Sequence, residues 1–198
     1  DHPAGFSQAA SVSSLRYDQA ANPPADQAEI RVQQLAQRLQ PQPAQVEVMD
    51  VDELDPDHEL FARRRVSPHG QGRIELFGEN VRSQQECDRL AEIRAQEFSC
   101  RERLYIGRST SPHLAAGATF SLDGHFDPAC DQQYLTVSLK HEGHQEDWES
   151  AGDAHGRTTP EAPEHHARFT AAPAGVAYRP WRTRPRPRVQ SLLYGDRK

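Results

Sequence analysis

Histidine is the residue type in this chain whose number and spacing could support chemistry. The 198-residue sequence has 10 histidines, which include His125, the pair His165 and His166, and the motif His141-Glu-Gly-His144. Neutral imidazole is a common zinc ligand, and three protein ligands with one open position activate a bound water for hydrolysis. The pattern raises the hypothesis of a zinc-dependent hydrolase that uses His141, His144 and a third ligand from His165 or His166.

The spacing of His141 and His144 argues against the helical zinc motif. In HExxH, two histidines lie a full helical turn apart and the glutamate between them acts as the base. Here the interval is one residue shorter, and the segment follows a predicted strand, on which residues 141 and 144 would face opposite sides. We therefore expect turn and loop histidines, and the zinc hydrolase remains the enzymatic alternative.

Other catalytic signatures are missing from the sequence. It contains no GxSxG nucleophile elbow and no phosphate-binding glycine loop. Clustered carboxylates repel one another and are typical of solvated surface, and this applies to Asp50, Asp52, Glu53, Asp55 and Asp57. We therefore expect no enzymatic activity, no catalytic, metal-binding or cofactor-binding residue, and no cofactor.

The three cysteines, Cys87, Cys100 and Cys130, indicate reduced thiols. They form no CxxC motif and an odd number cannot all pair, which argues against a disulfide scaffold and a zinc ribbon. Cys87 falls on the apolar face of a predicted helix, where a cysteine is expected to pack rather than to react.

The net charge of −6 is unevenly distributed. Residues 175–198 carry seven basic side chains and one acidic one, so residues 1–174 hold 16 basic and 28 acidic side chains. Arginine alternates with proline in this tail, a composition that favours an extended segment. Such a segment could grip phosphates, or serve as a linker whose charges stay solvated or meet an acidic face. We expect the linker, and no nucleic acid partner, because the body of the chain is acidic.

Composition indicates a thin hydrophobic core. Only 35% of residues are apolar, there are 15 prolines, and the mean hydropathy is −0.86. No apolar run approaches the ~18 residues of a membrane helix and no signal peptide opens the chain, so we expect no membrane insertion. Because the chain begins with Asp1 and Met49 is its only methionine, we expect it to be a fragment of a longer protein.

Residues 1–40 contain few predicted elements. A short strand-like patch covers residues 12–17. Residues 26–40 are mostly helix formers, with Val32, Leu35 and Leu39 at positions i, i+3 and i+7, a spacing that predicts a short amphipathic helix.

The clearest helix signal begins at Ser83. Ser83-Gln-Gln-Glu86 is a capping box, in which the serine hydroxyl and the glutamate carboxylate accept hydrogen bonds from free N–H groups of the first turn. Apolar residues then recur at helical spacing up to Phe98, and Arg94 lies at the edge of that face.

Short strands dominate the remainder. Period-2 alternation bounded by turn residues predicts strands over residues 46–51, 73–77, 103–106, 118–122, 134–139, 167–170 and 188–194. The close spacing of the last five favours a small antiparallel barrel or sandwich. The acidic stretch 145–164 has almost no aliphatic residues and is expected to be an exposed hairpin loop.

Several sequence blocks, in order, resemble the valine-glycine repeat (VgrG) spike proteins of type VI secretion. They are Gly72-Arg-Ile-Glu-Leu-Phe-Gly-Glu-Asn80, Leu90-Ala-Glu-Ile-Arg-Ala-Gln-Glu97, Leu114-Ala-Ala-Gly-Ala-Thr-Phe-Ser-Leu-Asp-Gly-His125, Tyr134-Leu-Thr-Val-Ser-Leu-Lys-His141, Phe169-Thr-Ala-Ala-Pro173 and Tyr178-Arg-Pro180. The resemblance covers about residues 45–195. It departs from the family at His165-His-Ala-Arg-Phe169, where the family has Tyr-x-Asn-x-Phe, and before Gln190, where the family's Pro-Gly is missing.

The resemblance implies a mainly β fold with minor α content (α+β): a phage-tail-hub-like small antiparallel β-barrel with one or two short helices. It also implies a division of the chain. Residues 1–44 would be a connector with a short helix, residues 45–175 the tail-hub-like barrel region, and residues 176–198 an extended basic linker with the first strand of a truncated OB-fold.

The family implies a structural role: a trimeric hub of the type VI puncturing spike that joins the secreted tube to the needle and delivers effectors. The implied partners are two further copies in the full-length parent, the haemolysin-coregulated tube protein, baseplate components, a spike-tip protein and effectors. The implied location is the bacterial cytoplasm on assembly, followed by translocation through the apparatus without a signal peptide. A phage tail hub of the same architecture is the alternative.

Overall fold

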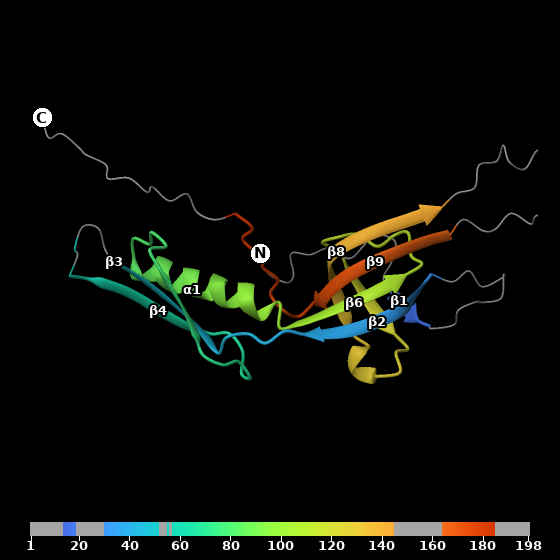
Figure 1. Ribbon diagram of the computed structural model, residues 1–198, viewed down its shortest axis with the longest axis horizontal. Coiled ribbons are helices and arrows are strands. Elements are labelled where there is room, and N and C mark those ends of the chain that lie inside the picture. The colour runs from blue at the N-terminus through green and yellow to red at the C-terminus, as the bar shows by residue number, and fades with distance from the viewer. Residues whose placement is uncertain (1–13, 19–29, 52–54, 56, 145–163, 185–198) are drawn as a thin grey trace, which may run out of the picture.

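The computed structural model of the chain describes residues 14–18, 30–51, 55, 57–144 and 164–184. Two parts lie end to end in Figure 1: a closed β-barrel, and a three-stranded sheet with one helix on it. The mainly β fold with minor α content is therefore confirmed. Within the described residues, no helix has the length and apolar character needed to cross a membrane.

The barrel closes in the strand order β1-β2-β6-β9-β8-β7. Its strands are β1 (Ser14–Tyr17), β2 (Arg31–Leu39), β6 (Arg103–Ser109), β7 (Thr119–Asp123), β8 (Gln133–His144) and β9 (Glu164–Pro173). The pairs among β2, β6, β9, β8 and β7 are antiparallel. Strand β1 differs because it runs parallel to both β2 and β7. The small antiparallel barrel is thus confirmed, with one parallel strand closing it.

The helix expected over residues 26–40 is wrong, because β2 occupies residues 31–39. The register of β2 against β6 shifts between Val32 and Gln34, and such a bulge inserts one extra residue into the alternation. Val32 and Leu35 therefore both contact the barrel core although they are three positions apart. A bulged strand produced the spacing that predicts a helix.

Aromatic side chains fill the barrel. Tyr105, Phe120, Tyr134 and Phe169 are each at most 2% exposed. Tyr134 packs on Tyr105 and Phe120 with ring centroids 4.8 and 5.6 Å apart. Both buried hydroxyls are satisfied: Tyr134 donates to the carbonyl of Cys130 over 2.7 Å, and the Gln132 amide donates to Tyr105 over 3.1 Å. These bonds offset the cost of burying polar atoms.

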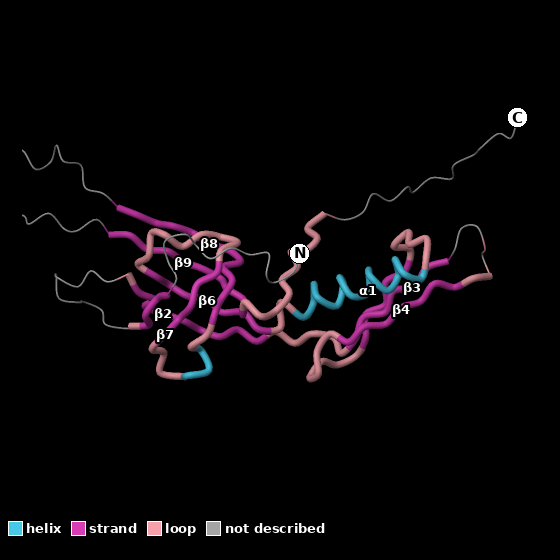
Figure 2. Tube along the Cα trace, turned by 180° about the vertical axis from the view of Figure 1, so that it is seen from behind, coloured by secondary structure: helices cyan, strands magenta, loops and turns pink. Residues whose placement is uncertain are grey.

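The second part is the sheet β4-β3-β5. Its strands are β3 (Gln45–Val51), β4 (Glu59–Arg65) and β5 (Arg73–Phe77), and its helix is α1 (Gln84–Ser99). Strand β3 lies between an antiparallel β4 and a parallel β5. Figure 2 shows α1 lying along one face of the sheet. The predicted strands 46–51 and 73–77 are confirmed, whereas β4, which contains the arginine run 63–65, was not predicted.

Helix α1 begins as the capping box predicts. The Ser83 hydroxyl accepts a hydrogen bond from the Glu86 N–H over 3.3 Å. The Glu86 carboxylate accepts from the N–H of Arg82 over 2.9 Å, one residue earlier than a regular capping box would place it. The buried side of α1 consists of Cys87, Ala91, Arg94 and Ala95.

Two neighbouring connections join the barrel to the sheet and its helix. One runs from β2 to β3 and the other from α1 to β6. The Gln40 N–H donates to the Glu102 carbonyl over 2.9 Å between them. Because β1 and β2 belong to the barrel while β3, β4, β5 and α1 do not, the expected boundary at residue 45 differs from this topology. Local patterns do not reveal that β2 pairs with β6, because the whole of the sheet and α1 separates these two strands along the chain.

Three other strand predictions, over residues 103–106, 118–122 and 134–139, correspond to β6, β7 and β8, and residues 167–170 lie within β9. Strand β1 lies within the patch at residues 12–17. The expected strand 188–194 and nearly all of the expected loop 145–164 lie outside the described residues.

Gly107 offers a test of this packing. A Cβ atom there would lie 2.3 Å from the ring of Phe169, which pairs with it across β6 and β9. Overpacking of this kind typically costs about 1–3 kcal/mol. We expect Gly107→Ala to lower the free energy of unfolding by that amount in urea denaturation. The control is Gly175→Ala, where a Cβ meets nothing within 4 Å. Equal stability of the two variants would contradict this contact.

Candidate functional site

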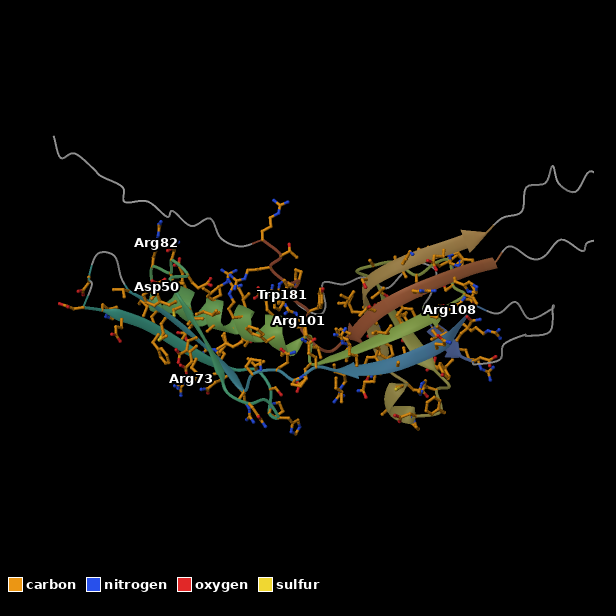
Figure 3. All side chains as sticks on the ribbon, in the orientation of Figure 1. Asp50, Arg73, Arg82, Arg101, Arg108 and Trp181 are labelled. Carbon is orange, nitrogen blue, oxygen red and sulfur yellow. The ribbon has the colours of Figure 1, made fainter. Side chains whose placement is uncertain are left out.

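The described end of the basic tail docks on helix α1, and we call residues 178–184 the docked segment. The Arg179 Nε donates to the Gln96 side-chain oxygen over 2.9 Å. The guanidinium of Arg101 stacks on the Trp181 ring, 3.5 Å from its centroid, and Figure 3 shows the two side chains together beside α1. A surface cavity of about 600 Å³ lies between the segment and the helix.

An ionic cluster lies beneath the docked segment. Arg94, which the sequence placed at the edge of the helix face, is buried, and it pairs with Glu79 over 2.9 Å and Glu97 over 2.7 Å. The side chains of Arg94 and Glu79 are 8% exposed and that of Glu97 is 13% exposed. Buried ions need close partners because their desolvation is costly. The i,i+3 spacing of Arg94 and Glu97 was the one signal of this cluster in the sequence.

Arg182 of the docked segment completes the charge balance of this cluster. Its guanidinium lies 3.4 Å from Glu79 and 3.7 Å from Glu97. With Arg182 present, two guanidinium groups face two carboxylates, and without it the cluster would keep one excess negative charge. Of the two alternatives for the linker charges, solvation or an acidic face, the structure shows the acidic face for Arg182.

The docked segment also covers Cys100. The Cys100 thiol is 3.4 Å from the Arg179 carbonyl and 3.5 Å from the Glu97 carbonyl, and the residue is 1% exposed. Burial raises the pKa of the Cys100 thiol, so it stays protonated and unreactive at neutral pH. Cys87 is also buried, and all three cysteines are free, as the sequence predicts.

The face of the sheet opposite α1 is open. Cross-strand register places Phe61, Met49 and Phe77 in one row on that face. Phe61 is 42% exposed and Phe77 72% exposed. On the same face Glu47 pairs with Arg63, directly opposite on β4, over 2.8 Å, and with Arg73 of β5 over 3.7 Å. Arg73 also pairs with Glu75, over 2.6 Å. The face therefore combines an apolar row with a neutralised charged row, a composition suited to contact with another protein surface.

The first residue of the acidic run 50–57, which was expected to be solvated, makes hydrogen bonds within the fold. Asp50 lies on the α1 side of β3, and its carboxylate accepts hydrogen bonds from the N–H groups of Val81 and Val51 over 3.1 and 3.0 Å. Asp50 thereby anchors the chain that enters α1 to the end of β3. The solvated-surface interpretation is wrong for this member of the run.

The histidines of the hypothetical zinc site are arranged differently from the hypothesis. Strand β8 runs through both His141 and His144, and β9 contains His165 and His166. The expectation of turn and loop histidines is therefore wrong for these residues, because the β8–β9 ladder continues as far as His144. The ring of His141 contacts His165, with 3.1 Å between Nδ1 and Nε2. His125 instead packs at a tilt against Tyr17 elsewhere in the barrel, with ring centroids 4.3 Å apart. The side chain of His144 lies outside the described set. Within the described residues, no three His, Cys, Asp or Glu side chains are grouped as a metal site would require, so no observation supports the zinc hydrolase.

The chain is similar to known proteins in sequence and in fold. The family model for the phage tail baseplate hub (GPD) matches residues 1–147. The actin cross-linking toxin VgrG1 of Vibrio cholerae serotype O1 is 29% identical over 101 residues, which are 51% of this chain and 8% of that protein.

Two solved structures share the fold. The 43 kDa tail protein of prophage MuSo2 from Shewanella oneidensis aligns with a TM-score of 0.54 at 11% identity, covering 86% of this chain and 46% of that one. The tail protein from Neisseria meningitidis MC58 aligns with a TM-score of 0.54 at 7% identity, covering 83% and 45%. The chain thus spans less than half the length of each of these proteins.

The docking of the segment is testable through Cys100. We expect the double variant Trp181→Ala, Arg182→Ala to raise the rate at which Cys100 reacts with a maleimide by at least about tenfold, because loss of the covering segment exposes the thiol. Peptide mass spectrometry separates Cys100 from the other two thiols. The matched control is Arg184→Ala, which removes a charge from the same segment but no ion pair seen within the described residues. An unchanged rate in the double variant would contradict docking.

Proposed function

The chain belongs to the phage tail baseplate hub family, and on this premise we propose that it is the hub segment of the puncturing spike of a type VI secretion system. The observation that carries the proposal is the family match over residues 1–147, which includes the sheet with α1 and most of the barrel. The similarity to the protein named VgrG1 supports the secretion spike among the systems that use such hubs.

In this proposal three copies of the full-length parent form a ring that joins the tube to the needle. The partners are the haemolysin-coregulated tube protein, baseplate components, a spike-tip protein and effectors. The apparatus assembles in the bacterial cytoplasm and then translocates the spike. The segment itself has a structural role: the actin cross-linking activity in the relative's name belongs to that protein, of which this chain matches 8%.

The thin core supports an assembly role. A subunit that buries surface against its neighbours relies less on its own core, since association adds to the stability of the folded state. The open face of the sheet, with the row Phe61, Met49 and Phe77, is the apolar surface that we assign to contact with a neighbouring subunit. The docked segment, which follows β9, would lead the chain from this subunit into the needle.

A phage tail hub of the same architecture is the second candidate. It is favoured by the two solved tail protein structures that share the fold, one of which comes from a prophage.

Deletion of the parent gene separates the two candidates. A type VI spike requires that release of the tube protein into the medium stops and that complementation restores it. Unchanged release, together with recovery of the chain in induced phage particles, would establish the phage hub instead.

We expect the full-length parent to have three times its subunit mass in native mass spectrometry. The reason is that a closed ring buries the same two surfaces on every copy. A monomer at the highest attainable concentration would contradict the trimeric hub.

The open sheet face can be tested in the same parent protein. We expect Phe61→Ser combined with Phe77→Ser to raise the dissociation constant of the assembly at least about tenfold, because buried aromatic anchors dominate interface energies. Light scattering over a dilution series measures the change, and circular dichroism checks the fold. The control is Phe126→Ser, at an aromatic that is 76% exposed on the barrel. Equal effects of both changes would argue against a specific role for the sheet face.

A further inference from the structure

The pair His141 and His165 lies at one end of the barrel, on its inner face. In the β8–β9 register Leu139 faces Phe169, His141 faces Ala167, and Gly143 faces His165. Side chains on a strand alternate between faces, so both histidines lie on the side of the buried Phe169 and Ala167. Lys140, one residue before His141, and Arg168, three residues after His165, are well exposed and face outward.

The outer nitrogen of each ring contacts a backbone carbonyl. His141 Nε2 lies 3.2 Å from the carbonyl oxygen of Leu114, and His165 Nδ1 lies 3.4 Å from that of Thr110. A carbonyl oxygen only accepts hydrogen bonds, so each of these nitrogens carries the ring proton. The loop between β6 and β7 thereby sets the tautomer of both histidines.

The inner nitrogens then face each other as two lone pairs. A neutral imidazole has one N–H, and in both rings that N–H is used on a carbonyl. His141 Nδ1 and His165 Nε2 are nevertheless only 3.1 Å apart. Two acceptors at this distance repel unless a cation lies between them, and that cation is either one extra proton or a metal ion.

We propose that His141 Nδ1 and His165 Nε2 bind one divalent transition-metal ion, such as Zn²⁺ or Cu²⁺. Bonds of about 2.0–2.1 Å at a tetrahedral angle separate two ligand nitrogens by ~3.3 Å, close to the observed distance. Imidazole is a preferred ligand of these metals. Donation of the other ring N–H to a backbone carbonyl is the usual support of a metal-binding histidine.

The site is a structural one. The described residues provide two protein ligands, and water completes the coordination on the solvent side, where His141 is exposed. The ion would tie the ends of β8 and β9 together and, through the two carbonyls, hold the loop that contains Thr110 and Leu114 against them. Such a link stabilises the end of β8 and the start of β9, between which residues 145–163 lie in the sequence.

Metal titration of the purified, chelator-treated chain tests the proposal. We expect Zn²⁺ to bind with a stoichiometry of one to the His141–His165 site in calorimetry and to raise the melting temperature, because a ligand of the folded state stabilises it. Cu²⁺ bound at the same site should show two nitrogen ligands in electron paramagnetic resonance.

Variants at the pair provide the decisive comparison. His141→Gln and His165→Gln should each weaken this binding at least about tenfold and abolish the thermal shift. His113→Gln, in the same loop region but without a ring contact to the pair, is the matched control and should bind as the wild type does. The proposal is overturned if neither variant changes the affinity for Zn²⁺. It is also overturned if nitrogen-15 NMR finds a proton shared between the two rings while added Zn²⁺ leaves their resonances unchanged.

Discussion

The short strand β1 closes the barrel, and this closure controls how the other elements are arranged. A sheet with free edges exposes unpaired backbone groups, and closure removes both edges. Strand β1 is very short, yet it pairs with β2 on one side and β7 on the other and buries Leu15 and Tyr17 in the core. With the barrel closed, β6, β8 and β9 have fixed neighbours. The ends of these strands then fix the positions of the histidine pair and of the two connections that lead to the sheet and α1.

Charge balance is the second organising feature, and it links segments far apart in the sequence. The cluster of Glu79, Arg94 and Glu97 is nearly removed from water, where an uncompensated charge is costly. Arg182, which lies beyond the last strand of the barrel, supplies the fourth charge. The opposite signs of the acidic body and the basic tail thus have a local structural meaning at Arg182, which is neutralised beside α1.

A hub function and this architecture are mutually consistent. The barrel is a well-packed unit with satisfied buried tyrosines, whereas the sheet covered by α1 has one open face with two exposed phenylalanines. A protein that acts by assembly needs rigid elements and exposed surfaces more than it needs a catalytic cleft. Within the described residues the polar clusters hold the fold together: Asp50 anchors the start of α1, and Glu47 binds two arginines of neighbouring strands.

Features that arise from interactions between neighbouring residues could be predicted from the sequence alone. The capping box at Ser83 and the alternation in β3, β5 and β8 were predicted because neighbouring residues decide them. The free cysteines were predicted from their odd number and the lack of a CxxC motif. Ordered sequence blocks also indicated the hub family. Long-range contacts, in contrast, make residues 31–39 a strand, bury Arg94 and bring the ring of His141 against that of His165. Each of these features depends on a partner that is distant in the sequence. Pairing with that partner overrides local propensity, and it leaves no signal in the residues nearby.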